Sequence, residues 1–169
     1  MSEFQITRVI NEHPIVISKL KLKGHIDTIL FAKHDSKDVC IIIDFKSIGS
    51  YPYKKKFGRK KDPTPSYHQE MQLAIYAVAV EHDFNISDSQ MFLVYYNKDT
   101  SMFKTIEVDR KYMNEAVEYW IKVNKACKEG LPKLLFGYSP KQKWECGYCS
   151  FADKCKQDHI KEWEREIYE

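Results

Sequence analysis

The sequence has 169 residues, a length that accommodates one domain with a core of its own and without disulfide bonds. Its apolar fraction of 43% and charged fraction of 30% are typical of globular proteins, which excludes a disordered chain. No run approaches the roughly 18 apolar residues of a membrane-spanning helix. Residues 1–10 lack the basic start and apolar run of a signal peptide. We therefore expect an intracellular, cytoplasmic protein.

The first predicted elements are strands. Residues 15–32 combine β-branched and apolar side chains with alternating lysines, which predicts one long strand or two strands in a meander. Residues 38–46 (DVCIIIDFK) predict a further strand, and the continuous apolar run at 39–43 is typical of a central strand buried on both faces. Residues 47–65 are rich in Gly, Pro, Lys and Tyr, which predicts a loop.

Helices and a hairpin follow. Residues 66–81 are apolar nearly all round at helical spacing, which predicts a well-buried helix. Residues 90–97 and 102–108 predict two strands joined by a turn, and residues 109–128 predict an amphipathic helix. This order of elements predicts an α/β fold with a mixed central sheet flanked by helices.

The net charge of +3 is small, but its distribution is uneven. Six cationic side chains fall within eight positions of the predicted loop: Lys54, Lys55, Lys56, Arg59, Lys60 and Lys61. Such a run is typical either of a segment that contacts phosphates or of a solvated loop, and composition alone does not decide between them. Tyr51, Tyr53 and Phe57 interleave with the basic residues, and we expect them to stack on nucleobases.

Asp44 and Lys46 lie two positions apart on a predicted strand, so their side chains share a face about 6.6 Å apart. A carboxylate and an ammonium at the end of a buried strand are costly to desolvate, which suggests a site for a charged substrate. A lone Asp-x-Lys is nevertheless more often a salt-bridged strand end, so the pair needs a further residue to indicate a site. Asp27, in the segment GHID, adds a second carboxylate on the preceding strand.

The oxygen atoms of these segments are of the kind that hard cations prefer. If the two strands pair, Asp27, Asp44 and the backbone carbonyl of Phe45 form a set of ligands suited to Mg²⁺ or Mn²⁺. Such a metal would polarise a phosphodiester and activate a water molecule. Lys46 would orient that water or offset negative charge in the transition state.

Gln72 and Tyr76 are spaced i, i+4 on the predicted buried helix, so they share one of its faces, with His68 one turn before them. Polar side chains in an apolar helix need hydrogen-bonding partners, but on its own the pair is a weak indication of a site. A core tyrosine beside an incidental glutamine is the alternative interpretation of this pair.

Taken together, Asp27 in GHID, Asp44 and Lys46 in IIDFKS, and Gln72 and Tyr76 in QLAIY resemble the RecB-like nucleases of the PD-(D/E)XK superfamily. CRISPR-associated RecB-like exonucleases and phage exonucleases are of this type. The resemblance implies a restriction-endonuclease-like core in which the two aspartates bind the metal, the lysine serves catalysis and the Gln–Tyr helix contacts DNA or supports the site. It implies a metal-dependent exonuclease or end-processing enzyme that acts on single-stranded DNA or duplex ends.

The sequence departs from this family before Asp27. The family usually has an N-terminal helix with a His or Glu that also binds the metal, whereas most of the 26 preceding residues here read as strand. Glu3, Glu12 and His13 are the candidates. Either a second protein chain completes the active site, or the protein is a catalytically degenerate DNA-binding or partner module.

Three of the five cysteines fall within ten residues: Cys146, Cys149 and Cys155. Thiolates this close repel one another unless a cation holds them. The triplet resembles the one that, with an upstream cysteine, holds a [4Fe–4S] cluster in many family members. His159 is the alternative fourth ligand, in a Cys₃His zinc site. The remaining thiols, Cys40 and Cys127, are expected to be inert and in the core.

The domain organisation follows from these assignments. We expect residues 1–140 to form the nuclease core and residues 141–169 to form a Cys-rich metal or iron–sulfur segment packed on it, within a single domain. A short charged helix at residues 157–167 is predicted to end the chain.

Overall fold

The computed structural model describes residues 4–35, 37–59, 67–129, 150 and 152–154. Its elements are β1 (Phe4–Ile17), a 3₁₀ turn (Ser18–Leu20), β2 (Leu22–His34), β3 (Lys37–Ile48), α1 (Ser50–Phe57), α2 (Tyr67–Phe84), β4 (Ser89–Asn97), β5 (Met102–Val108) and α3 (Lys111–Glu129). The chain divides into two compact units, Met1–Lys125 and Ala126–Glu169. The sheet, α1, α2 and nearly all of α3 belong to the first unit.

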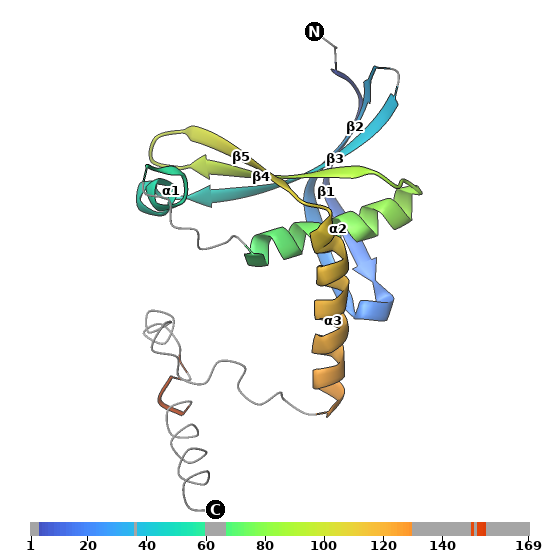
Figure 1. Ribbon diagram of the computed structural model, residues 1–169, viewed down its shortest axis with the longest axis vertical. Coiled ribbons are helices and arrows are strands. Elements are labelled where there is room, and N and C mark those ends of the chain that lie inside the picture. The colour runs from blue at the N-terminus through green and yellow to red at the C-terminus, as the bar shows by residue number, and fades with distance from the viewer. Residues whose placement is uncertain (1–3, 36, 60–66, 130–149, 151, 155–169) are drawn as a thin grey trace, which may run out of the picture. The chain divides into compact units, whose positions relative to one another are not determined.

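Five strands form one mixed sheet in chain order, β1-β2-β3-β4-β5. Strands β3 and β4 are parallel, and the other neighbours are antiparallel. A parallel pair needs a long crossover, and the segment that contains α1 and α2 provides it. Figure 1 shows α2 lying across one face of the sheet. This architecture agrees with the predicted α/β fold and its mixed central sheet.

Helix α2 is buried on almost every side, as its apolar composition predicts. Leu73, Ala74, Ala77 and Val80 are all 0% exposed, and the helix packs against β1, β3, β4 and β5. Burial of these side chains contributes to the stability of the fold. The helix therefore forms a rigid base for the polar side chains near its N-terminal end.

Strand β3 is central, but only one of its faces is buried. Cys40, Ile42 and Asp44, on the α2 side, are each at most 4% exposed. On the other face, Ile43 is half-buried and Phe45 is 49% exposed. The prediction that this strand is buried on both faces is therefore wrong, because α2 covers one face of β3 and a continuous apolar run does not report which faces are covered.

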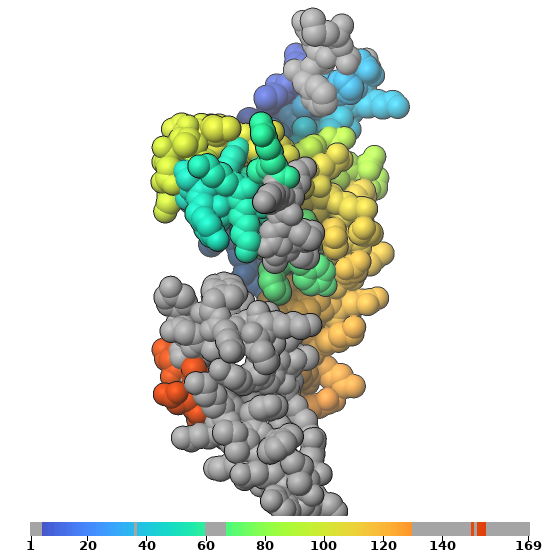
Figure 2. Space-filling view, turned by 60° about the vertical axis from the view of Figure 1, so that its left-hand side comes forward, coloured from blue at the N-terminus to red at the C-terminus, as the bar shows by residue number. Residues whose placement is uncertain are grey.

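Helix α1 replaces the first half of the predicted loop after β3. Two of its side chains, Tyr53 and Phe57, are spaced i, i+4 and pack together, and Phe57 meets the ring of Tyr95 edge-on. Asp99 in the β4–β5 turn accepts a hydrogen bond of 2.6 Å from the backbone N–H of Ser50, at the start of α1. Contacts with distant segments thus stabilise this short helix, which lies beside the β4–β5 hairpin (Figure 2).

Arg110 joins three elements at the far end of α2. Its guanidinium donates to both carboxylate oxygens of Glu81, at 2.6 and 3.2 Å, and to the carbonyl oxygens of Ser89 and Ser87. Glu81 also accepts hydrogen bonds from the N–H and hydroxyl of Ser89. This network fixes the start of β4 and the start of α3 against α2.

The two cysteines that the structure describes behave differently. Cys40 is 4% exposed, and burial, helped by the charge of Glu81, raises the pKa of its thiol to about 11. This agrees with the predicted inert core thiol. Cys127 is exposed, so the prediction for it is wrong. The side chains of α3 that pack on the core, such as Ala116 and Trp120, belong to earlier turns of the helix.

Several predicted features fall outside the described residues: Glu3, Lys60, Lys61, Cys146, Cys149, Cys155, His159 and the C-terminal helix. None of the helices that the structure describes is long and apolar enough to cross a membrane.

Candidate active site

A chain of polar contacts links β3 to α2. Lys46 Nζ lies 2.6 Å from Asp44 Oδ2 and donates a hydrogen bond of 2.9 Å to Gln72 Oε1. Gln72 Nε2 in turn donates to the hydroxyl of Tyr76 at 3.0 Å. The structure thus brings together four residues that the sequence places on a strand and on a helix.

Asp27 lies at the same end of the sheet. The β2–β3 ladder ends at the pair Thr28–Ile43, and Asp27 and Asp44 are the next residues on the two strands. Beyond that pair, a side chain replaces the regular backbone ladder: Asp27 Oδ2 accepts a hydrogen bond of 2.7 Å from the N–H of Phe45. The two carboxylates therefore meet beside the Phe45 peptide.

Asp44 is a buried acid in an unusual electrostatic setting. Its side chain is 5% exposed, and burial raises its pKa. The hydrogen bond and charge of Lys46 oppose this rise, and the negative charge of Asp27 adds to it. The Oδ2 atom is sealed from solvent and has no well-aligned hydrogen-bond donor, although the Lys46 ammonium lies beside it. A carboxylate oxygen held in this way favours the approach of a cation.

The donor set fits a hard divalent cation better than a soft one. It consists of two carboxylates and a backbone carbonyl, all oxygen atoms. Among the described residues, no group of three or more His, Cys, Asp or Glu side chains is arranged to hold a metal ion. A cation here would therefore complete its coordination shell with water or with oxygen atoms of a substrate.

Glu12 and His13, the two candidates for a further metal ligand that lie within the described residues, have different surroundings. Glu12 lies level with Asp27 in the β1–β2 ladder, between two regular pairs, and is exposed. Its backbone is left-handed, with φ of 51°, which is uncommon for a residue other than glycine. The ring of His13 lies 5.4 Å from that of Phe84, so this histidine packs against α2. Glu12 is thus the better placed of the two, although it forms no metal cluster in this structure.

Gly24 is a contributor to the site that the sequence analysis missed. A Cβ atom at this position would lie 3.1 Å from both Cε1 and the hydroxyl oxygen of Tyr76. Glycine therefore allows β2 to approach the tyrosine ring closely. The signal was present in the segment GHID, where the glycine precedes Asp27 by three residues.

The basic residues of α1 and Arg59, two positions after it, differ in their surroundings. Lys54, Lys55 and Arg59 are exposed. Lys56 instead places its ammonium 4.6 Å from the ring centroid of Tyr95, and burial lowers the pKa of this lysine, opposed by the charge of Glu70.

The position of Tyr95 places Lys56 on the active-site side of the sheet. Tyr95 pairs with Lys46 in the β3–β4 register, and its hydroxyl donates a hydrogen bond to Gln69 on α2. Lys56 therefore extends toward the part of the sheet that carries Lys46.

The aromatic residues of α1 differ from their predicted role. Tyr53 is 5% exposed, and Phe57 is half-buried against Tyr95. The prediction that Tyr53 stacks on nucleobases is wrong, because the helix turns this side chain into the core. For the half-buried Phe57 it stays a prediction. Tyr51 is 80% exposed and stays available for such a contact.

The order of these segments agrees with a match to a known family. Residues 2–156 match the PD-(D/E)XK nuclease superfamily. The chain belongs to this superfamily. Asp27 on β2 and Asp44 and Lys46 on β3, the residues that carry the resemblance in the sequence, lie within the matched segment.

Two solved structures are similar to this PD-(D/E)XK chain. The crystal structure of SSO0001 shares 24% identity at a TM-score of 0.43, and the match covers 88% of this chain and 61% of that one. The crystal structure of a "Putative exonuclease" from Eubacterium rectale shares 15% identity at a TM-score of 0.46, with coverage of 73% and 47%. The chain thus spans less than two thirds of either protein. No curated protein matches the sequence.

Proposed function

We propose that the protein is a divalent-metal-dependent deoxyribonuclease, an exonuclease or end-processing enzyme that hydrolyses phosphodiester bonds. The observation that carries this proposal is the setting of Asp44. Its carboxylate is buried, its pKa is raised, and its sealed oxygen has a lysine ammonium beside it. A protein keeps such a charge at a cost in stability, which favours a functional role over a structural one.

Asp27, Asp44 and the Phe45 carbonyl would hold Mg²⁺ or Mn²⁺. The bound ion would polarise the phosphodiester and lower the pKa of a coordinated water molecule. When the Asp44 carboxylate turns to a cation, Lys46 keeps Gln72 as its hydrogen-bond partner. The ammonium then stays in place to orient the attacking water or to offset charge on the phosphate.

Gln72 and Tyr76 position Lys46 in this proposal. Their hydrogen bond fixes the amide of Gln72 so that its oxygen faces the ammonium. The buried ring of Tyr76, which is 9% exposed, anchors this arrangement against Gly24. The pair therefore acts through Lys46 rather than on the phosphate itself.

Phosphate contacts along the DNA fall to the basic segment. The exposed Lys54, Lys55 and Arg59 would neutralise phosphates outside the active site, with Lys56 closer to it. Lys60 and Lys61 extend the same run of charge. An anionic substrate is thus attracted to the end of the sheet where Asp44 and Lys46 lie.

The cysteine triplet near the C-terminus is proposed to hold a [4Fe–4S] cluster, with zinc in a Cys₃His site as the alternative. Both groups suit the reducing cytoplasm that the sequence predicts. Anaerobically purified protein should be brown with a cluster and colourless with zinc, and elemental analysis separates the two. Substituting His159→Ala should remove zinc but leave a cluster largely intact. Well-folded protein with neither metal would refute both versions.

A catalytically degenerate DNA-binding or partner module is the second candidate function. The observation that favours it is the lack, among the described residues, of a third carboxylate or histidine grouped with Asp27 and Asp44. A second protein chain that supplies this ligand would complete the metal site and allow catalysis.

One assay separates the two candidates. Purified protein is incubated with end-labelled single-stranded and duplex DNA in Mg²⁺, in Mn²⁺ and in EDTA. The nuclease proposal expects cleavage that EDTA abolishes. Binding of DNA without cleavage in either metal would favour the degenerate module.

A further inference from the structure

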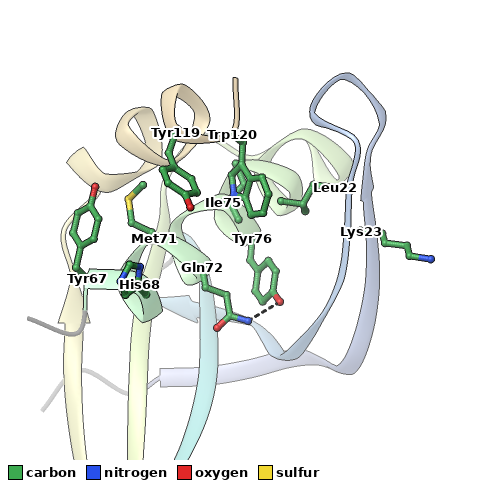
Figure 3. A pocket seen from close by; sticks show the side chains of 10 residues that line it. All are labelled: Leu22, Lys23, Tyr67, His68, Met71, Gln72, Ile75, Tyr76, Tyr119 and Trp120. Carbon is green, nitrogen blue, oxygen red and sulfur yellow. Dashed lines mark hydrogen bonds between the residues drawn. The ribbon is translucent and has the colours of Figure 1, made fainter. Parts of the chain in front are cut away.

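A cavity opens beside the polar chain that supports Lys46. Its volume is about 280 Å³, and it is lined by residues of α2, α3 and the start of β2. Figure 3 shows Gln72 and Tyr76 along one side, Tyr67 and His68 on another, and Tyr119 with Trp120 across from them. Nothing in the proposed hydrolysis uses this space.

We propose that this cavity binds one unpaired nucleobase of the strand that is cleaved. The inference rests on the proposed nuclease function and adds to it a binding site for a base of the substrate. The proposed ligand is a nucleobase, which is a flat and largely apolar ring system with polar edges.

The walls of the cavity suit a flat ring. Aromatic side chains from two helices face it, and the aliphatic side chains of Leu22, Met71 and Ile75 complete the lining. At the rim, Tyr119 is 47% exposed and Tyr67 is 38% exposed, so both carry aromatic surface that remains in contact with water. Stacking on a base would bury this surface, and aromatic platforms are the usual means by which proteins hold single strands.

The charge of the lining suits a ligand attached to a polyanion. No carboxylate is among the described residues that line the cavity, whereas Lys23 and His68 are. Figure 3 shows the ammonium of Lys23 directed away from the cavity, which leaves the interior uncharged. A base can therefore enter while its phosphates stay near the cationic groups outside.

The cavity and the catalytic lysine share one residue. Gln72 donates to Tyr76 on the cavity side and accepts the hydrogen bond from Lys46 on the other. A strand whose phosphate lies at Lys46 therefore has a neighbouring base within reach of the cavity. The amide and hydroxyl at this junction also offer partners to the polar edge of a base.

The size of the cavity suits a ligand as small as a base. Pockets for drug-sized ligands enclose about 300–1,000 Å³, so this one falls just below that range. A base in a duplex is paired and stacked, so it must first unpair to enter, as in enzymes that extrude their target base. The geometry therefore favours unpaired over paired substrate.

Binding measured in EDTA tests the proposal without requiring catalysis. The probes are a single-stranded oligonucleotide carrying 2-aminopurine and a blunt duplex of the same sequence, each titrated with the full chain. Wild-type protein should bind the single strand more tightly and quench the 2-aminopurine fluorescence by stacking. The variant Tyr119→Ala should bind the single strand about tenfold more weakly and lose the quenching, with duplex binding unchanged.

Two variants control for folding and for general loss of aromatic surface. Tyr119→Phe retains the ring and should bind like wild type. Phe103→Ala removes an aromatic side chain that is 60% exposed on β5, outside the cavity, and should have no effect. If Tyr119→Ala matches wild type in affinity and quenching, the cavity does not hold a base.

The outcome is separable from that of the nuclease proposal. If wild type cleaves single strands and blunt duplexes equally, and Tyr119→Ala is as active as wild type, the nuclease proposal stands and the base-binding proposal is wrong. If wild type cleaves nothing, but Tyr119→Ala loses single-strand affinity and quenching, the base-binding proposal stands and the nuclease proposal is wrong.

Discussion

Lys46 on β3 and Gln72 on α2 are joined by a hydrogen bond of 2.9 Å between Nζ and Oε1. This bond gives the ammonium a second partner besides Asp44 and ties the strand that carries the acid to the helix behind it. The position of Lys46 is therefore set by two elements, and it does not depend on the state of the Asp44 carboxylate alone.

Lys46→Ala should lower the rate of DNA cleavage on the order of 10²-fold, because it removes a positive charge that stabilises the transition state. Gln72→Ala should have a smaller effect, since the ammonium remains but is held less firmly. Single-turnover cleavage rates in Mn²⁺ measure both effects. If the metal site is intact, Mn²⁺ should raise the melting temperature of both variants as much as that of the wild type. An unchanged cleavage rate in Lys46→Ala would remove this residue from the mechanism.

Gly24→Ala should reduce both stability and activity. The added Cβ would lie 3.1 Å from Tyr76 Cε1 and its hydroxyl, so the ring must give by a few tenths of an ångström, which disturbs its hydrogen bond to Gln72. We expect the free energy of unfolding to fall by about 1 kcal/mol, as for mild overpacking. Urea denaturation and the cleavage rate provide the measurements. Stability and activity equal to wild type would show that the close approach of Tyr76 is not needed.

Replacing Lys54 and Lys55 together by alanine should weaken DNA binding and reduce its dependence on salt. For a single strand, removing one lysine that neutralises a phosphate lowers the slope of log affinity against log salt by about 0.7. Lys37→Ala is the matched control, since this exposed lysine begins β3, about 23 Å along the strand from Asp44. A slope that does not change in the double variant would exclude these lysines from the interface.

Arg110→Ala should destabilise the fold without touching the active site. The change leaves the carboxylate of Glu81, whose side chain is 15% exposed, with only Ser89 as partner. The expected decrease is about 2 kcal/mol in the free energy of unfolding. Lys111→Ala serves as control, because the ammonium of Lys111 forms its ion pair with the exposed Asp109, at 3.5 Å.

The ion pair of Glu81 with Arg110 also makes the free energy of unfolding depend on pH. Burial by itself raises the pKa of Glu81, but the hydrogen bonds from Arg110 and Ser89 outweigh it, so the pKa lies below its ordinary value of 4.5. The ionised form is thus favoured in the folded state, and its contribution is present above pH 4.5 and lost as the pH falls through the folded pKa. The difference in free energy of unfolding between wild type and Arg110→Ala should become smaller below pH 4.5. A difference that stays constant with pH would contradict this account.

Much of the candidate site could be predicted because it depends on local periodicity. The two-residue repeat of a strand puts Asp44 and Lys46 on one face, and the helical repeat pairs Gln72 with Tyr76. The short connection between β2 and β3 makes them neighbours, which brings Asp27 to Asp44. These relationships need no knowledge of the tertiary packing.

The features that were missed depend on segments far apart in the sequence. Helix α1 carries three consecutive lysines. It is held by Tyr95, which lies 38 positions after Phe57, and by Asp99, which lies 49 positions after Ser50. The cavity lies where side chains of α3, such as Tyr119, and of α2, such as Tyr67, line one space. Neither packing arrangement leaves a periodic signal in its own segment, so sequence patterns do not predict it.

The role of Asp44 is the central claim, and cleavage of labelled single-stranded DNA in Mn²⁺ by Asp44→Asn tests it most directly. Asp38→Asn is the matched control, since Asp38 lies on the same strand with its side chain 88% exposed. We predict that wild type and Asp38→Asn cleave at the same rate, and that Asp44→Asn, although folded, produces no detectable cleavage. Cleavage by Asp44→Asn at the wild-type rate would contradict the assignment of this site.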